Sequence, residues 1–245
     1  MHYRVLMAMW ALVFTAGMAW GAKYKVQDVT DGGTLSGKIT FTGTAPDPIE
    51  IPIEKNQEIC GEGTRKIVEV TVGGNGGLQH SVVYFENVNA GKDWAKPEGG
   101  WELNQKNCTF LPWVQVMKNK DNIKVTNNDP VLHNIHTYEL IGKVRRTLFN
   151  EGQPTQGFTF EKKVRMRRGN VMKIECDAHN FMHAYSLVLD NPYWAITAPN
   201  GTFKIDQIPP GNYKVTVWHS LLGTSTSEID IAAGQSAELN HQFKK

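Results

Sequence analysis

The sequence predicts an all-β protein, and three observations support this fold class. Glycine is frequent, with 23 residues in a chain of 245. Long windows with the period of an amphipathic helix are absent. Apolar and polar residues instead alternate over short stretches that end in turn signals, which is typical of half-buried strands. A chain of this length holds one large or two small domains.

The strand-like stretches follow one another along the whole chain. In the first of them, Leu35, Ile39 and Phe41 lie on one face with a period of two, broken by glycine. Stretches of similar character cover residues 67–72, 81–85, 110–117, 123–126, 173–175 and 184–189. Lys163, Arg165 and Arg167 alternate with apolar residues and predict a strand with a basic outer face. That face is either simply solvated or a docking patch for an acidic redox partner.

Soft metal-ligand residue types gather in one loop, residues 176–182, whose sequence is Cys-Asp-Ala-His-Asn-Phe-Met. Cys176, His179 and Met182 offer a thiolate, an imidazole and a thioether between two predicted strands. A fourth ligand must come from elsewhere, because one short loop cannot surround an ion. His133 follows the turn signal at 127–130 and supplies a second imidazole. Two histidines, one cysteine and a weak methionine are the ligand set that suits copper.

These two segments resemble the cupredoxins, and the short Cys-x-x-His-x-x-Met loop is most similar to the amicyanin type among the plastocyanin-like proteins. The resemblance covers roughly residues 105–190. It implies a Greek-key β-sandwich, one type 1 copper ion per chain and one-electron transfer, with His133, Cys176, His179 and Met182 as the metal ligands. His136, offset by three from His133, is expected on the opposite face of its strand. His183 is either a rival ligand or an exposed imidazole.

The C-terminal part has a different pattern. An Asn-Gly pair at 200–201 predicts a tight hairpin, and a Pro-Pro-Gly turn at 209–211 leads into an alternating strand. This segment resembles the carboxypeptidase regulatory-like (prealbumin-type) β-sandwich, and residues 33–41 and 81–85 fit the opening strands of that family. The resemblance implies a fold without an enzymatic activity, because no zinc-peptidase signature accompanies it.

Two domain layouts are compatible with these resemblances. In the preferred one, residues 23–104 and 191–245 form a single discontinuous prealbumin-like or Ig-like sandwich, and the cupredoxin domain of residues 105–190 is inserted into it. In the alternative, three small units follow one another.

The N-terminus and the cysteines concern the cellular compartment. Residues 1–22 read as a secretory signal peptide, with an uncleaved anchor as the alternative. The protein is therefore expected in the periplasm or another extracytoplasmic space. If Cys176 binds the metal, Cys60 and Cys108 remain to form a disulfide; two buried free thiols are the alternative.

Together these features predict an exported electron carrier rather than an enzyme. A redox protein such as a cytochrome or a periplasmic dehydrogenase or oxidase is the expected partner. A formal net charge of +2 gives no reason to expect nucleic acid binding. A copper-trafficking protein and an envelope adhesion or scaffold module are the alternatives. A multicopper oxidase is disfavoured because the sequence contains no His-x-His pair. The oligomeric state is left open.

Overall fold

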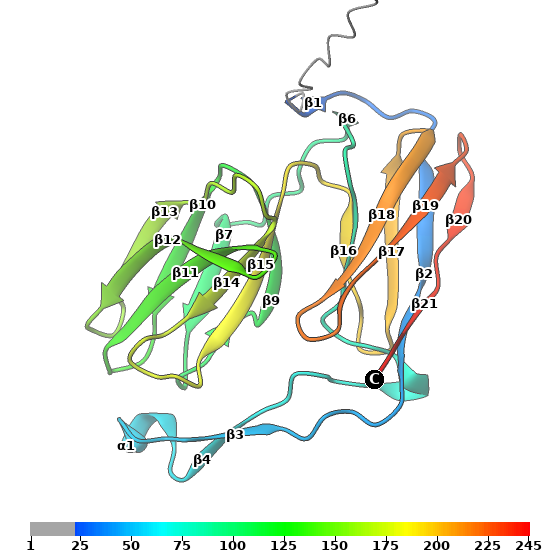
Figure 1. Ribbon diagram of the computed structural model, residues 1–245. Helices are drawn as coiled ribbons and strands as arrows, with labels where there is room; N and C mark the ends of the chain where they lie inside the picture. Colours follow the sequence, from blue (N-terminus) through cyan, green and yellow to red (C-terminus); the bar gives the residue numbers. More distant parts are fainter. Residues whose placement is uncertain (1–22) are drawn as a thin grey trace, which may run out of the picture.

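A computed structural model describes residues 23–245, and the expected signal peptide lies outside these residues. The predicted all-β fold class is confirmed: strands dominate, and helix is confined to the short α1 (Gln57–Cys60) and the 3-10 turn η1 (Gly74–Gly76) within the described range. In that same range no helix is long and apolar enough to cross a membrane. The strands form two β-sandwiches that lie side by side, with a small hairpin extending beneath one of them (Figure 1).

The first sandwich, here called the central sandwich, is built from one continuous stretch of chain. Its two sheets have the strand orders β12-β11-β14-β15-β9 and β13-β10-β7-β8. The strands are β7 (Trp101–Gln105), β8 (Phe110–Leu111), β9 (Val114–Lys118), β10 (Asn122–Asn127), β11 (His133–Ile141), β12 (Val144–Gln153), β13 (Thr159–Lys163), β14 (Val171–Glu175) and β15 (His183–Leu189). The burial of β11 alternates along the strand, so that His133 and Ile135 face the core and His136 faces outward, as predicted.

The second sandwich, here called the outer sandwich, combines strands from both ends of the described chain. Its sheets have the orders β16-β5-β18-β19 and β17-β2-β20, with β21 also paired to β2. The strands are β2 (Gly33–Thr42), β5 (Val82–Phe85), β16 (Trp194–Ile196), β17 (Thr202–Ile208), β18 (Gly211–His219), β19 (Gly223–Ile231), β20 (Ser236–Glu238) and β21 (His241–Lys244). A further short parallel pair joins β1 (Lys25–Val26) to β6 (Ala90–Gly91).

Each sandwich has its own apolar core, and a third apolar cluster joins the two. Val82, Tyr84 and Trp218 of the outer sandwich pack in this cluster against strands β9 and β15 of the central one. Strand β15 is therefore buried on both faces along almost its whole length. This contact holds β15, which follows the loop formed by residues 176–182.

A hairpin with α1 between its strands extends from the outer sandwich under the central one. We call this segment, residues 49–67, the arm; it consists of β3 (Ile49–Pro52), α1 and β4 (Thr64–Ile67). Ile53 of the arm is 4% exposed and packs in the core of the central sandwich. The predicted disulfide is confirmed: Cys60 of the arm is bonded to Cys108 of the central sandwich across 48 residues of chain. On the chain-entropy model such a link stabilises a fold by about 4 kcal/mol.

The structure differs from the sequence predictions in four places. Strand β7 pairs with β10, so the central sandwich begins at Trp101 rather than at residue 105. In the stretch 67–72 only Ile67 belongs to a strand. In the basic stretch the strand ends at Lys163. Buried and exposed side chains nevertheless continue to alternate beyond it, since Val164 and Met166 are buried and the arginines between and after them are exposed.

The fourth difference concerns the Asn-Gly turn. Strands β16 and β17 on either side of it do not form a hairpin, because β16 pairs with β5 and β17 pairs with β2. Gly201 has a φ of +81°, and a Cβ atom there would lie 2.2 Å from the carbonyl oxygen of Ile39. The turn therefore carries the chain from one sheet to the other, and close packing against β2 requires the glycine.

Candidate metal centre

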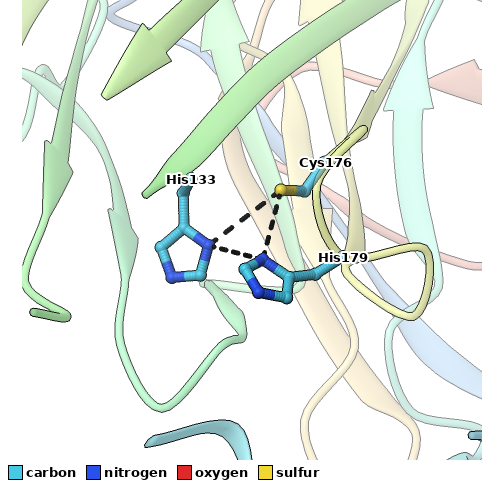
Figure 2. A group of neighbouring side chains, drawn as sticks. All are labelled: His133, Cys176 and His179. Atoms are coloured by element: carbon cyan, nitrogen blue, oxygen red, sulfur yellow. Dashed lines mark hydrogen bonds between the residues drawn. The ribbon is translucent and has the colours of Figure 1, made fainter. Parts of the chain in front are cut away.

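Three of the four predicted ligands converge at one end of the central sandwich (Figure 2). The Nδ1 atoms of His133 and His179 are 3.1 Å apart, and the Cys176 Sγ atom lies 4.0 Å and 3.8 Å from them. Bonds of about 2.0 Å to nitrogen and about 2.3 Å to sulfur would place such ligand atoms about 3–4 Å apart. The cluster is fully covered, with the three side chains 0%, 2% and 3% exposed for His133, His179 and Cys176.

The loop that carries two of these ligands is held by its own backbone and by one asparagine. The N–H of Met182 donates to the carbonyl of His179, and the N–H of Cys176 donates to the carbonyl of Met182. The Oδ1 atom of Asn134 accepts the N–H of Asp177 at 2.6 Å and lies 3.4 Å from the Cys176 Sγ atom. Asn134 follows His133 in β11, so its hydrogen bonds join the start of β11 to the loop of residues 176–182.

The outer nitrogen of each histidine contacts an oxygen atom. His133 Nε2 lies 2.9 Å from the Asp129 carboxylate, which also accepts the N–H groups of Asn107 and Cys108. His179 Nε2 lies 3.0 Å from the side-chain oxygen of Asn56. Carboxylate and amide oxygens only accept hydrogen bonds, so each Nε2 carries the proton. The Nδ1 atom of each ring is then the nitrogen that a metal ion would bind.

This arrangement of donor atoms fits a metal ion. The two Nδ1 atoms lie 3.1 Å apart, and a cation between them and the Cys176 sulfur would be within bonding distance of all three atoms. The second histidine-containing set, Cys108, Asp129 and His133, is not a separate site, because the Cys108 sulfur is used in the disulfide. The imidazole and thiolate donors are of the type that copper prefers.

The electrostatic environment keeps the histidine ready to bind metal. Burial, followed by the neighbouring His133, lowers the pKa of His179 to about 4, so this imidazole is neutral at pH 7. Burial raises the pKa of the Cys176 thiol, and a metal ion would displace its proton. Burial alone would raise the pKa of Asp129, but hydrogen bonds from Cys108, His133 and Asn107 outweigh it and lower the pKa. Asp129 therefore stays ionised beside the cluster.

The remaining candidates have different positions. Met182 is 2% exposed and belongs to the same core cluster as Cys176; its role as a ligand stays a prediction. His136 stacks on Tyr138 and contacts the Asp177 carboxylate on the outer face. His183 packs against Trp113 and Tyr185. Neither belongs to the group of metal-binding side chains found among the described residues.

Asp129 and Asn56 were not predicted as site residues from the sequence. Asp129 lies four residues before His133, and this spacing was a usable signal, although the residue reads as part of a turn. Asn56 lies 123 residues from His179 in sequence, and no local pattern connects them.

Comparisons with known proteins found one matching family model and several similar solved structures, each for part of the chain. A family model described as polysaccharide lyase family 4, domain II, matches residues 180–239. This family differs from the prealbumin-type one to which the segment was likened, and that likeness stays a prediction. No curated protein matches the sequence.

Similar solved structures cover little more than a third of the chain. A purple cupredoxin from Nitrosopumilus maritimus is 23% identical over 36% of this chain and 99% of its own, with a TM-score of 0.31. Amicyanin from Paracoccus versutus is 16% identical over 39% of this chain and 86% of its own, with a TM-score of 0.32. A copper-containing nitrite reductase from Thermus scotoductus is 12% identical over 36% of this chain and 22% of its own, with a TM-score of 0.30.

Proposed function

We propose that this protein is an exported one-electron carrier that holds one type 1 copper ion. His133, Cys176, His179 and Met182 would be the ligands. The observation that carries the proposal is the cluster of two imidazole nitrogens and one sulfur, 3.1–4.0 Å apart and buried, with both outer nitrogens bound to acceptors. Bound copper would supply a Cu(I)/Cu(II) couple, and the protein would fix the ligands for both oxidation states.

The burial of the site favours electron transfer over copper trafficking. An ion passed to another protein must leave its ligands, whereas an electron needs only proximity. His179 is 2% exposed, and the arm that carries its partner Asn56 is bonded to the central sandwich by the disulfide. Release of the ion would require this covered end to open. The same burial supports a carrier role rather than a catalytic one.

The proposed location is the periplasm or another extracytoplasmic compartment. The Cys60–Cys108 disulfide supports this, since such bonds persist in oxidising compartments. A redox protein would be the partner, and the exposed basic side chains Lys163, Arg165 and Arg167 suit one with an acidic surface.

The test is titration of the purified apoprotein with copper(II) while the visible spectrum is recorded. We expect one ion per chain and an intense thiolate-to-copper band. Cys176→Ala should abolish the band, and His133→Gln should abolish or strongly alter it. His219→Gln is the matched control, because His219 is also 0% exposed but lies in the outer sandwich. An intense band in the Cys176→Ala protein, or none in the unmodified protein, would refute the assignment.

A further inference from the structure

We propose that the arm completes the metal centre from outside the central sandwich. Asn56 holds the ring of His179, Asp129 holds the ring of His133, and the Cys60–Cys108 disulfide joins these two positioning residues. The inference rests on the proposed metal centre, but its main readouts are properties of the apoprotein.

The backbone of Asn56 makes its side chain available for His179. This residue precedes α1 and has φ 53° and ψ 41°, in the left-handed region that asparagine tolerates better than most residues. An asparagine at this position commonly caps the helix with its side chain. Here there is no side-chain cap, and the backbone carbonyl of Asn56 accepts the N–H groups of Ile59 and Cys60. The side-chain oxygen instead accepts the His179 Nε2–H at 3.0 Å.

Asp129 is the counterpart on the other histidine, and it is tied directly to the disulfide. Its carboxylate accepts the N–H of Cys108 at 2.8 Å and the N–H of Asn107 at 2.7 Å, in addition to contacting His133. Cys108 is bonded to Cys60, which is the last residue of α1. Asn56 and Asp129 are thus connected through one short helix and one covalent bond, and each contacts a different imidazole of the cluster.

Arg65 adds a third connection between the arm and the ligand loop. Its guanidinium donates to the carbonyl of Cys60 at 2.8 Å and to that of Asn107 at 3.2 Å. The same group lies 5.1 Å from the ring centroid of Phe181, within the range of a cation–π contact. The Phe181 ring is itself 5.7 Å from the His179 ring. The arm therefore contacts the ligand loop on both sides of the disulfide.

The consequence is that neither imidazole can rotate without breaking a hydrogen bond to a group that the disulfide restrains. Partners of this kind fix the tautomer and the orientation of a ligand, and their loss typically weakens metal binding 10- to 100-fold. The Nε2 edge of His179 faces Asn56 of the arm, and the residue is only 2% exposed, so a redox partner has almost no direct access to this imidazole.

The first experiment replaces Asn56 by glycine, which accepts the left-handed backbone and removes the hydrogen-bond acceptor. Asn75→Gly is the matched control, because Asn75 has nearly the same backbone angles, φ 54° and ψ 36°, and lies in the 3-10 turn η1 between β4 and β5. Asn56→Asp should rescue, since a carboxylate also accepts the Nε2–H. The readouts are the ¹⁵N NMR tautomer of His179 and the alkylation rate of Cys176, both in apoprotein.

We expect Asn56→Gly to lose the fixed Nε2–H tautomer of His179 and to speed Cys176 alkylation. We also expect copper release to a chelator to be at least about tenfold faster. Asn75→Gly and Asn56→Asp should behave like the unmodified protein in the apoprotein measurements. Unchanged tautomer and alkylation in Asn56→Gly would overturn the inference while leaving the proposed function intact. If the apoprotein results appear as expected but no copper binds, the proposed function fails and the positioning role stands.

A second experiment tests the role of the disulfide. In a Cys60→Ser/Cys108→Ser protein, Asn56→Gly should change the His179 tautomer and the Cys176 alkylation rate much less than in the disulfide-bonded protein, because the arm is already loosened. An equal effect in both backgrounds would show that Asn56 acts independently of the disulfide and would overturn the coupling. Should the serine variant not fold, phosphine reduction of the folded apoprotein followed by the same NMR measurement makes the same comparison.

Discussion

The two sandwiches use the same kind of strand pairing but differ in what they bury. The central sandwich places two histidines and a thiol in one cluster at its end, whereas within residues 23–245 the outer sandwich has no comparable group of metal-binding side chains. Both nevertheless bury a histidine completely: His133 and His219 are each 0% exposed. Burial of a histidine is therefore not what distinguishes the site.

The surroundings of His219 explain the difference. Its Nδ1 atom accepts the N–H groups of Leu221 and Leu222 at 3.3 and 3.4 Å, in the turn between β18 and β19. Burial, followed by His80, lowers the pKa of His219 to about 4, so the ring is neutral and its Nδ1 lone pair serves a turn. In His133 the corresponding Nδ1 atom faces a second imidazole and a sulfur. The convergence of potential ligand atoms distinguishes the candidate site, in keeping with the rule that function depends on the site more than on the fold.

The largest expected effect comes from shortening the chain, which should unfold one sandwich and leave the other folded. A protein that ends at Asp190 lacks β16 to β21, and these include every strand that pairs with β2 or β5 in the outer sandwich. The central sandwich keeps all its strand pairs, because they lie within 101–189. We expect the outer segments to unfold while the central sandwich persists.

Limited proteolysis with mass spectrometry would measure this. Rapid cleavage within 23–48 and 68–93, together with protection of 101–189, is the expected result. The disulfide should keep a fragment containing Cys60 attached to the protected core. A cooperatively folded, protease-resistant outer segment in the shortened chain would contradict the discontinuous layout and favour successive units.

The second prediction concerns a buried charge that serves structure in the central sandwich. The Glu139 side chain is fully buried, and one oxygen accepts the N–H groups of Arg167, Arg168 and Gly169 at 2.6–2.8 Å. Its other oxygen pairs with Arg146. Glu139→Gln should lower the free energy of unfolding by about 2–4 kcal/mol at pH 7 and leave copper binding unchanged. Chemical denaturation measures the first quantity and copper titration the second.

The pH dependence of this contribution has a defined sign. Burial alone would raise the pKa of Glu139, but the hydrogen bonds from Arg168, Gly169 and Arg167 outweigh it and lower the pKa from 4.5 to about 2. The folded state therefore favours the ionised form, and the stabilisation is complete above about pH 4.5 and declines as the pH falls toward 2. The difference in stability between the two proteins should shrink over that range. A difference independent of pH would exclude the charge as its cause.

The sequence predicted features that depend on local pattern and missed those that depend on distant contacts. Cys176 and His179 lie in one loop and His133 begins a strand after a turn, so their types and spacing could be read directly. The Asn200–Gly201 pair has the local chemistry of a hairpin turn, but packing of Gly201 on Ile39 directs the chain into the other sheet. Asn56 has no local signal at all, because its role exists only once the arm lies against the central sandwich.

The smallest expected effect concerns Met182, whose substitution should change the properties of the proposed metal centre without abolishing copper binding. A thioether is a soft donor that suits Cu(I), whereas an amide oxygen is a harder donor that favours Cu(II). If Met182 is the weak fourth ligand of a carrier, Met182→Gln should lower the reduction potential while copper stays bound in both oxidation states. Met182→Leu, which keeps the apolar volume and offers no oxygen, should not lower it. Voltammetry of the three proteins gives the potentials, and competition titrations give the Cu(I) affinities.

The same measurements distinguish a carrier from a trafficking protein, because the two roles place different demands on Met182. A carrier needs fast, reversible exchange of one electron without rearrangement of the metal ligands. A trafficking protein needs the thioether to capture Cu(I), so the glutamine variant would mainly lose Cu(I) affinity. Slow, irreversible voltammetry of the unmodified protein together with a large loss of Cu(I) affinity in Met182→Gln would reject the carrier. A lowered reduction potential with copper still bound would instead show that Met182 adjusts the potential of the Cu(I)/Cu(II) couple.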